Sequence, residues 1–150
     1  MKRSKLEIGS FLMVFLGVYT IVISLLWIFV TEIMFVSDFA YYTGQTYPQY
    51  LASDPSFAQM YIITKKLIGF ILLANGIMIL LLTQKSYRKA EKWSWYALLI
   101  GGGISWGTFI GYKIFIGYIG YSIITFVVGA TLLVVGLAFP VKEILGKKAI

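Results

Sequence analysis

Four long apolar stretches constrain this chain of 150 residues more than any other feature of its sequence. They cover about residues 8–30, 61–83, 93–111 and 118–139, and crossing the hydrocarbon core of a bilayer takes roughly 20 helical residues. With 59% hydrophobic and 13% charged residues, the chain is too apolar for a water-soluble domain, in which about a quarter of the residues are charged. We therefore predict an all-α fold, with the whole chain forming a single integral membrane bundle of four transmembrane helices.

Basic residues are divided unevenly between the two ends of these predicted helices. Lys65, Lys66 and Lys113 fall at one end, and the other end carries Lys2, Arg3, Lys5, Lys85, Arg88, Lys89, Lys92, Lys142, Lys147 and Lys148. The positive-inside rule then places both termini in the cytoplasm of a multi-pass protein of the cell membrane, with a long outer loop at about residues 31–60. The net charge of +7 suits contact with anionic lipid. The basic residues are scattered over short segments beside the bilayer, which does not favour nucleic-acid binding.

The predicted outer loop is rich in tyrosine and is expected to be structured, as a lid on the bundle, a docking surface or the roof of a pocket. Ser53 or Asp54 followed by Pro55 predicts a helix start, so the second helix is expected to project beyond the bilayer, with Lys65 and Lys66 snorkelling at its surface. An interfacial belt of aromatic rings is expected at both helix ends: Trp93, Trp95 and Tyr96 inside, and Trp27, Tyr61, Tyr112, Tyr118 and Tyr121 outside.

Glycine is concentrated in the third stretch, although an interior Gly costs about 1 kcal/mol in a soluble helix. In lipid, small side chains allow helices to approach closely. Gly103, Gly107 and Gly111 form two GxxxG steps on one face, which is expected to pack within the bundle or to bind a second copy or another protein. Small residues seven apart predict one packing seam in each helix: Ser10, Gly17, Ser24 and Thr31; Gly69, Gly76 and Thr83; Ser94, Gly101 and Thr108; Ser122, Gly129 and Gly136.

Polar side chains in the middle of the predicted spans are the candidate binding residues: Tyr19, Thr20, Asn75, Ser105 and Thr125. Asn75 needs a partner in hydrocarbon, where an interhelical hydrogen bond is worth about 0.6–2 kcal/mol. It is expected to bond to a neighbouring helix and fix its register, or to line a small polar cavity with the others. Glu32 is expected to pair with Lys65 or Lys66 at the interface or, alternatively, to act as a proton-coupled carboxylate at the cavity mouth.

No catalytic pattern is present in the sequence. The chain has no Cys and no His, which removes thiolate chemistry, the commonest metal ligand and the usual general base near neutral pH. Its six acidic residues are dispersed, and no P-loop, GxSxG or HExxH motif occurs. We therefore expect no catalytic residue, no metal and no cofactor, and leave open an enzyme that uses Tyr, Asn, Glu, Lys or Arg.

One segment, YRKAEKWSWYALL at residues 87–99, resembles the basic-Glu-Lys-Trp-x-Trp start of the third helix in several small four-helix membrane families, including DoxX-like proteins. The resemblance implies a four-helix fold and carries over no site residue. A small multidrug exporter would instead place a Glu in the middle of the first helix, whereas Glu32 lies at its outer end.

Two functions are compatible with this sequence. The first is a non-catalytic integral membrane protein, an accessory or assembling subunit of a homo-oligomer or a larger membrane complex. The second is a carrier or enzyme for a small lipophilic molecule, with a polar cavity near Asn75 and with Glu32 at its mouth. Membrane lipids are the expected partners in both cases, and nucleic acid in neither.

Overall fold

The computed structural model describes residues 4–120 and 122–146, which form seven α-helices, one short 3-10 helix and no strand. The elements are α1 (Lys5–Phe29), α2 (Thr31–Thr43), α3 (Tyr47–Ser53), α4 (Pro55–Lys85), η1 (Tyr87–Lys89), α5 (Lys92–Ile116), α6 (Ser122–Ala138) and α7 (Val141–Leu145). The predicted all-helical class is confirmed for these residues. Helices α1, α4 and α5 are long and apolar enough to cross a membrane, and α6 is apolar but shorter. Tyr121 of the predicted belt and the basic residues Lys2, Arg3, Lys147 and Lys148 lie outside the described residues.

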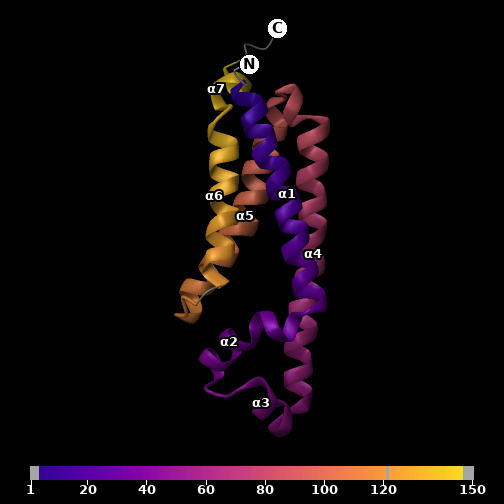
Figure 1. The fold of residues 1–150 in the computed structure, drawn as a ribbon, viewed down its shortest axis with the longest axis vertical. Coiled ribbons are helices and arrows are strands. Elements are labelled where there is room, and N and C mark those ends of the chain that lie inside the picture. The colour runs from indigo at the N-terminus through magenta and orange to yellow at the C-terminus, as the bar shows by residue number, and fades with distance from the viewer. Residues whose placement is uncertain (1–3, 121, 147–150) are drawn as a thin grey trace.

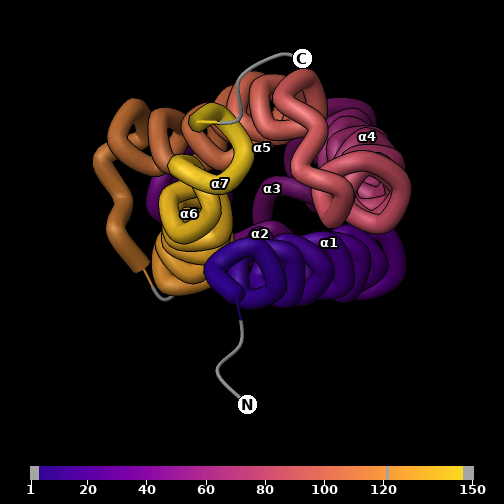
Figure 2. The backbone as a smooth tube through the Cα atoms, turned by 90° about the horizontal axis from the view of Figure 1, so that it is seen from above, coloured from indigo at the N-terminus to yellow at the C-terminus, as the bar shows by residue number. Residues whose placement is uncertain are grey.

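The four longest apolar helices, α1, α4, α5 and α6, lie side by side (Figures 1 and 2). Helix α1 packs most extensively along α4 and also along α6, and α6 packs along α5. The start of α1, the α4–α5 connection and α7 share one end of the molecule, whereas α2 and α3 lie at the opposite end (Figure 1). The backbone N–H of Leu6 donates a 3.0 Å hydrogen bond to Glu143 Oε2, which ties α1 to α7.

Glycines give α1 and α4 their close approach. A Cβ added to Gly17 would lie 2.6 Å from Leu80 Cδ2, and one added to Gly76 would lie 3.1 Å from the backbone nitrogen of Ile21. Gly69, Gly129 and Gly136 also lie at helix contacts, against Ile28, the Trp106 ring and Met13 respectively. A larger side chain at these five positions would separate neighbouring helices, because packed interiors have no room for added atoms.

Helix α5 is rotated relative to the prediction from its small residues. Its buried positions are Ser94, Leu98, Gly102, Trp106 and Lys113, and a Cβ added to Gly102 would lie 2.7 Å from Leu133. The predicted seam through Gly101 and Thr108 is wrong, because both residues are exposed. One residue turns a helix by about 100°, which carries the predicted seam off the packed face. The large Trp106 ring, seated against Gly129, determines which face of α5 is inside.

Residues 31–60 form α2, α3 and the start of α4, joined by short connections, rather than one long loop. A break at Val30 separates α1 from α2, and the side chain of Asp54 caps α4 by accepting a 3.1 Å hydrogen bond from the N–H of Phe57. The predicted helix start at Pro55 is therefore confirmed. Helix α2 is held against the bundle by Phe35, whose ring centroid lies 4.5 Å from that of Trp27. Trp27 is only 4% exposed, so its predicted place in an interfacial belt is wrong.

Candidate binding site

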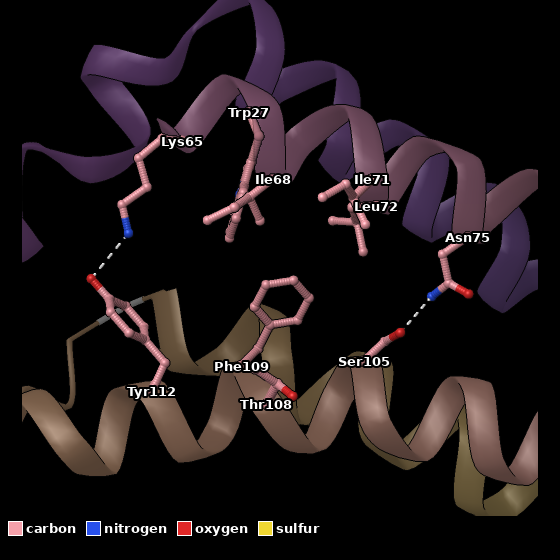
Figure 3. A pocket seen from close by; sticks show the side chains of 10 residues that line it. All are labelled: Trp27, Lys65, Ile68, Ile71, Leu72, Asn75, Ser105, Thr108, Phe109 and Tyr112. Carbon is pink, nitrogen blue, oxygen red and sulfur yellow. Dashed lines mark hydrogen bonds between the residues drawn. The ribbon is translucent and has the colours of Figure 1, made fainter. Parts of the chain in front are cut away.

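A cleft of about 320 Å³ lies between α4 and α5 near the end of the molecule that carries α2. Its volume falls within the range of about 300–1,000 Å³ that is typical of small-molecule sites. Figure 3 shows side chains of both helices directed into it, with Trp27 of α1 at its back. The lining residues are Trp27, Lys65, Ile68, Ile71, Leu72, Asn75, Ser105, Thr108, Phe109 and Tyr112.

The cleft is polar at its two ends and apolar between them. At one end Asn75 Nδ2 donates a 2.9 Å hydrogen bond to Ser105 Oγ, which provides the expected interhelical partner for Asn75. At the other end Lys65 Nζ donates a 3.2 Å hydrogen bond to the Tyr112 hydroxyl. Figure 3 shows both bonds bridging α4 and α5, with aliphatic and aromatic side chains between them. Such a site offers an elongated ligand an apolar wall and a hydrogen-bonding group at each end.

A second pocket of about 600 Å³ lies among α2, α3, α4 and α5. Asp38 and Tyr42 of α2, Tyr50 of α3, and Phe57 and Tyr61 of α4 are among its lining residues. Lys65 and Tyr112 line this pocket as well as the cleft, so the bond between them lies at the boundary of the two spaces. Helices α2 and α3 thus cover a pocket, which is one of the roles that the sequence predicts for this segment.

One salt bridge is formed in the described part of the chain, between Lys113 of α5 and Asp38 of α2. Lys113 Nζ donates to both carboxylate oxygens, at 2.5 and 2.6 Å, and the two side chains are 0% and 1% exposed. Two charges buried this deeply are stable only when they are paired, because each loses its hydration. The salt bridge therefore fixes α2 against α5, and the rings of Tyr118 and Phe126 lie within 6 Å of Lys113 Nζ.

Lys65 does not snorkel to the surface as predicted. It is only 8% exposed, and its Nζ lies over the rings of Tyr112 at 4.4 Å, Phe35 at 4.7 Å and Tyr61 at 5.2 Å. Lys66, the next residue, is exposed as expected. The two lysines differ because Lys65 lies on the face of α4 that also buries Gly69, Leu72 and Gly76.

The predicted cavity residues divide between several places in the structure. Asn75 and Ser105 meet in the cleft. Tyr19 does not line it, because its hydroxyl donates a 2.9 Å hydrogen bond to the carbonyl of Thr125 and its ring stacks on Trp106. Thr20 is buried and donates a 2.7 Å bond to the carbonyl of Leu16 within its own helix. A single polar cavity that contains all five residues is therefore not formed.

Glu32 lies apart from the cleft. It is exposed and lines a surface pocket together with Lys66 at the base of α2. In residues 4–120 and 122–146 neither Lys65 nor Lys66 forms a salt bridge with it, so the expected interfacial ion pair is wrong. The acidic residue of α2 that is buried against the bundle is Asp38, six residues after Glu32 in the same helix.

Sequence reasoning missed Lys65, Tyr112, Phe109 and Trp27 as site residues. An ionisable residue inside a predicted span is itself a signal of a functional site, and Lys65 carries that signal. No family model matches the sequence, and no curated protein or solved structure matches it either. The resemblance of residues 87–99 to DoxX-like proteins therefore stays a prediction, and the chemistry of the site has to be argued from its own residues.

Proposed function

We propose that this chain is an integral membrane protein that binds a small lipophilic molecule in the cleft between α4 and α5. In this proposal α1, α4, α5 and α6 all cross the bilayer and both termini are cytoplasmic, as the basic residues beside η1 and α7 favour. The observation that carries the proposal is the cleft itself, with apolar walls between two interhelical hydrogen bonds. A tightly filled contact between α4 and α5 would have favoured a purely structural protein.

The packing of the helices supports an accessible cleft. Helix α4 contacts α1 along much of its length but contacts α5 far less. Phe109, Ile68 and Ile71 are partly or largely exposed although they face the gap. Lipid tails or lipophilic molecules in the bilayer therefore have a direct lateral route to the site, without passing through water.

Photolabelling tests this proposal. The purified protein is placed in phosphatidylcholine nanodiscs with a diazirine-bearing dodecanol, irradiated, and mapped by mass spectrometry. We expect labels on cleft residues of α4 and α5, and competition by plain dodecanol. Thr108→Trp should abolish the labels on cleft residues, because an indole at this lining position occupies the cleft. Thr131→Trp is the matched control, since Thr131 is exposed on α6 and does not line the cleft. Labels spread evenly over all lipid-facing helices would contradict the proposal.

A second candidate function, assembly with another copy or a larger membrane complex, is favoured by one observation on α5. A Cβ added to Gly101, Gly103, Gly107 or Gly111 would have no atom of another described helix within 4 Å. The GxxxG face is thus open, and a helix from another chain can approach its backbone closely.

Gly107→Ile tests the assembly function. We expect the variant to melt like the wild type, because the added side chain meets open space, but to lose self-association or partner recovery. Native size in mild detergent and a melting curve are measured together. A variant with normal melting and the wild-type assembly size would exclude this face as an interface.

A further inference from the structure

The charges at the α2 end of the bundle do not balance. Asp38 is the single buried carboxylate among the described residues there, and both of its oxygens accept from Lys113. Lys65 is a second buried ammonium group, and its described hydrogen-bond partner is the neutral hydroxyl of Tyr112. The described residues of this end thus contain two buried ammonium groups but one buried carboxylate, which leaves an excess positive charge beside the cleft.

The surroundings of Lys65 stabilise this charge only in part. Three aromatic rings, those of Phe35, Tyr61 and Tyr112, lie within about 5 Å of its Nζ. Cation–π contacts of this kind offset some of the desolvation of an ammonium group. A Lys side chain has three N–H donors, and the Tyr112 hydroxyl uses one of them. The remaining donors suit an anionic acceptor, because a charge-assisted hydrogen bond is about twice as strong as a neutral one.

The geometry of the cleft places an apolar channel directly beside this cation. Ten residues of α4 separate Lys65 from Asn75, about 15 Å at 1.5 Å per residue. Ile68, Ile71 and Leu72 line the interval from α4, and Phe109 lines it from α5 (Figure 3). A ligand whose charge lies at Lys65 therefore has room for a hydrocarbon chain that extends toward Asn75.

We infer that the ligand of this cleft is an anionic amphiphile, with a carboxylate or phosphate headgroup bound by Lys65 and Tyr112 and an aliphatic chain between α4 and α5. This inference rests on the proposed lipophile-binding function and names the ligand class of the same site. A cationic amphiphile would be repelled by the excess ammonium charge. A neutral one would fill the apolar channel but leave the charge without a counterion. The same headgroup chemistry belongs to single-chain acids and to anionic phospholipids, which the test separates.

Competition against the photoreactive dodecanol tests the inference in phosphatidylcholine nanodiscs. The competitors share one chain length and differ in charge: dodecanoate, dodecyl phosphate, dodecanol and dodecyltrimethylammonium. We expect the two anions to displace the label at concentrations about tenfold or more below that of dodecanol, and the cation to be the weakest competitor. A second arm replaces part of the phosphatidylcholine with phosphatidylglycerol. Once the charge series has shown a preference for anions, loss of label in this second arm identifies membrane phospholipid as the source of the headgroup, and retained label identifies the single-chain acid.

Paired lysine variants locate the headgroup. Lys65→Gln should remove the preference for anions, so that dodecanoate and dodecanol then compete at similar concentrations, whereas Lys65→Arg should keep the preference. Lys66→Gln is the matched control, because it removes the same charge from the exposed neighbouring residue. If Lys65→Gln melts far below the wild type, Tyr112→Phe replaces it, and we expect a smaller but definite loss of anion preference because one headgroup donor is removed.

The possible results separate the two proposals. Absence of specific label from α4 and α5 overturns the lipophile-binding function itself. Specific label with equal competition by dodecanol and dodecanoate keeps that function and overturns the anionic headgroup. An equal loss of anion preference in Lys65→Gln and Lys66→Gln also overturns the headgroup site, because it shows general attraction of anions to a basic surface.

Discussion

Asp38 and Lys113 are far apart in the sequence, and their contact fixes α2 to the end of the bundle. Each charge is stabilised by the other, because neither side chain reaches water. Removing one partner leaves an uncompensated buried charge, which is more costly than losing an exposed ion pair. Substitution of either residue therefore tests whether α2 packs against α5 as described.

Asp38→Asn is expected to destabilise the protein by about 3–5 kcal/mol, because it leaves the Lys113 ammonium buried without a counterion. Denaturant unfolding in detergent measures the loss. The double variant Asp38→Leu, Lys113→Met should be clearly more stable than Asp38→Asn, since neither charge then remains. An Asp38→Asn variant as stable as the wild type would show that the two groups do not meet.

Glu91 provides a pH test at the opposite end of the molecule. Hydrogen bonds from the Ser86 side chain and the Trp93 indole hold the pKa of the Glu91 carboxyl below its ordinary value. A carboxyl whose pKa is lower in the folded state contributes stability above its unfolded pKa, which is about 4.3, and loses it as the pH falls through the folded value. The stability difference between the wild type and Glu91→Gln should thus be constant near neutral pH and shrink below about pH 4. A difference that grows on acidification would contradict this.

Lys65 shows what the sequence could have revealed about the site. The buried positions of α4 include Lys65, Leu72 and Ile79, each seven residues from the next, so Lys65 lies on the packed face. Helical periodicity thus distinguishes Lys65 from Lys66, although both are lysines within the same predicted span. Tyr112, in contrast, becomes a site residue only through the rotation of α5, which no local pattern specifies.

At the scale of elements, small residues predict helix contacts well where no large side chain of the same helix occupies the contact instead. Gly17 and Gly76 face each other across α1 and α4, in agreement with their seven-residue repeats. On α5 the same repeat indicated Gly101, whereas Trp106 and Gly102 occupy the contact with α6. The choice between two glycine-bearing faces is made by the fit of one indole ring, which depends on the neighbouring helix.

Gly76→Leu and Gly101→Leu form a matched pair that tests this register. Gly76→Leu should lower the free energy of unfolding by about 1–3 kcal/mol or more, because the added side chain would meet the backbone of α1. Gly101→Leu should change stability by less than about 0.5 kcal/mol, since it meets open space. Melting curves in detergent compare the two variants. A Gly101→Leu variant that is less stable than Gly76→Leu would show that α5 is rotated from the described position.

At the scale of the whole molecule, the all-helical class was predictable from the sequence, and the structure of the end that carries α2 and α3 was not. The length of the apolar stretches indicates the long helices without any knowledge of packing. The helices α2 and α3 were not predicted, because their apolar residues are too few to span a membrane and their burial depends on contacts such as Phe39 with Tyr50 and Tyr61.

Cysteine labelling tests the proposed orientation of the whole chain. Cysteines introduced at the exposed Gln45 and Ser56 should react in intact cells with an impermeant thiol reagent, whereas one at the exposed Lys89 should react only after permeabilisation. The native chain has no Cys, so each label reports a single site. Labelling of Lys89→Cys from outside would reverse the orientation.

The unequal lengths of α4 and α6 have a consequence for the bilayer around the protein. At 1.5 Å per residue, α4 is about 46 Å long and α6 about 25 Å, against a hydrocarbon thickness of about 30 Å. In the proposed topology α4 extends beyond the hydrocarbon layer at its Pro55 end, whereas the shorter α6 requires the lipids beside it to form a thinner layer. With that topology, the lipids would be thinned on the α6 side alone, and membranes of shorter lipid chains would accommodate the protein at a lower free-energy cost.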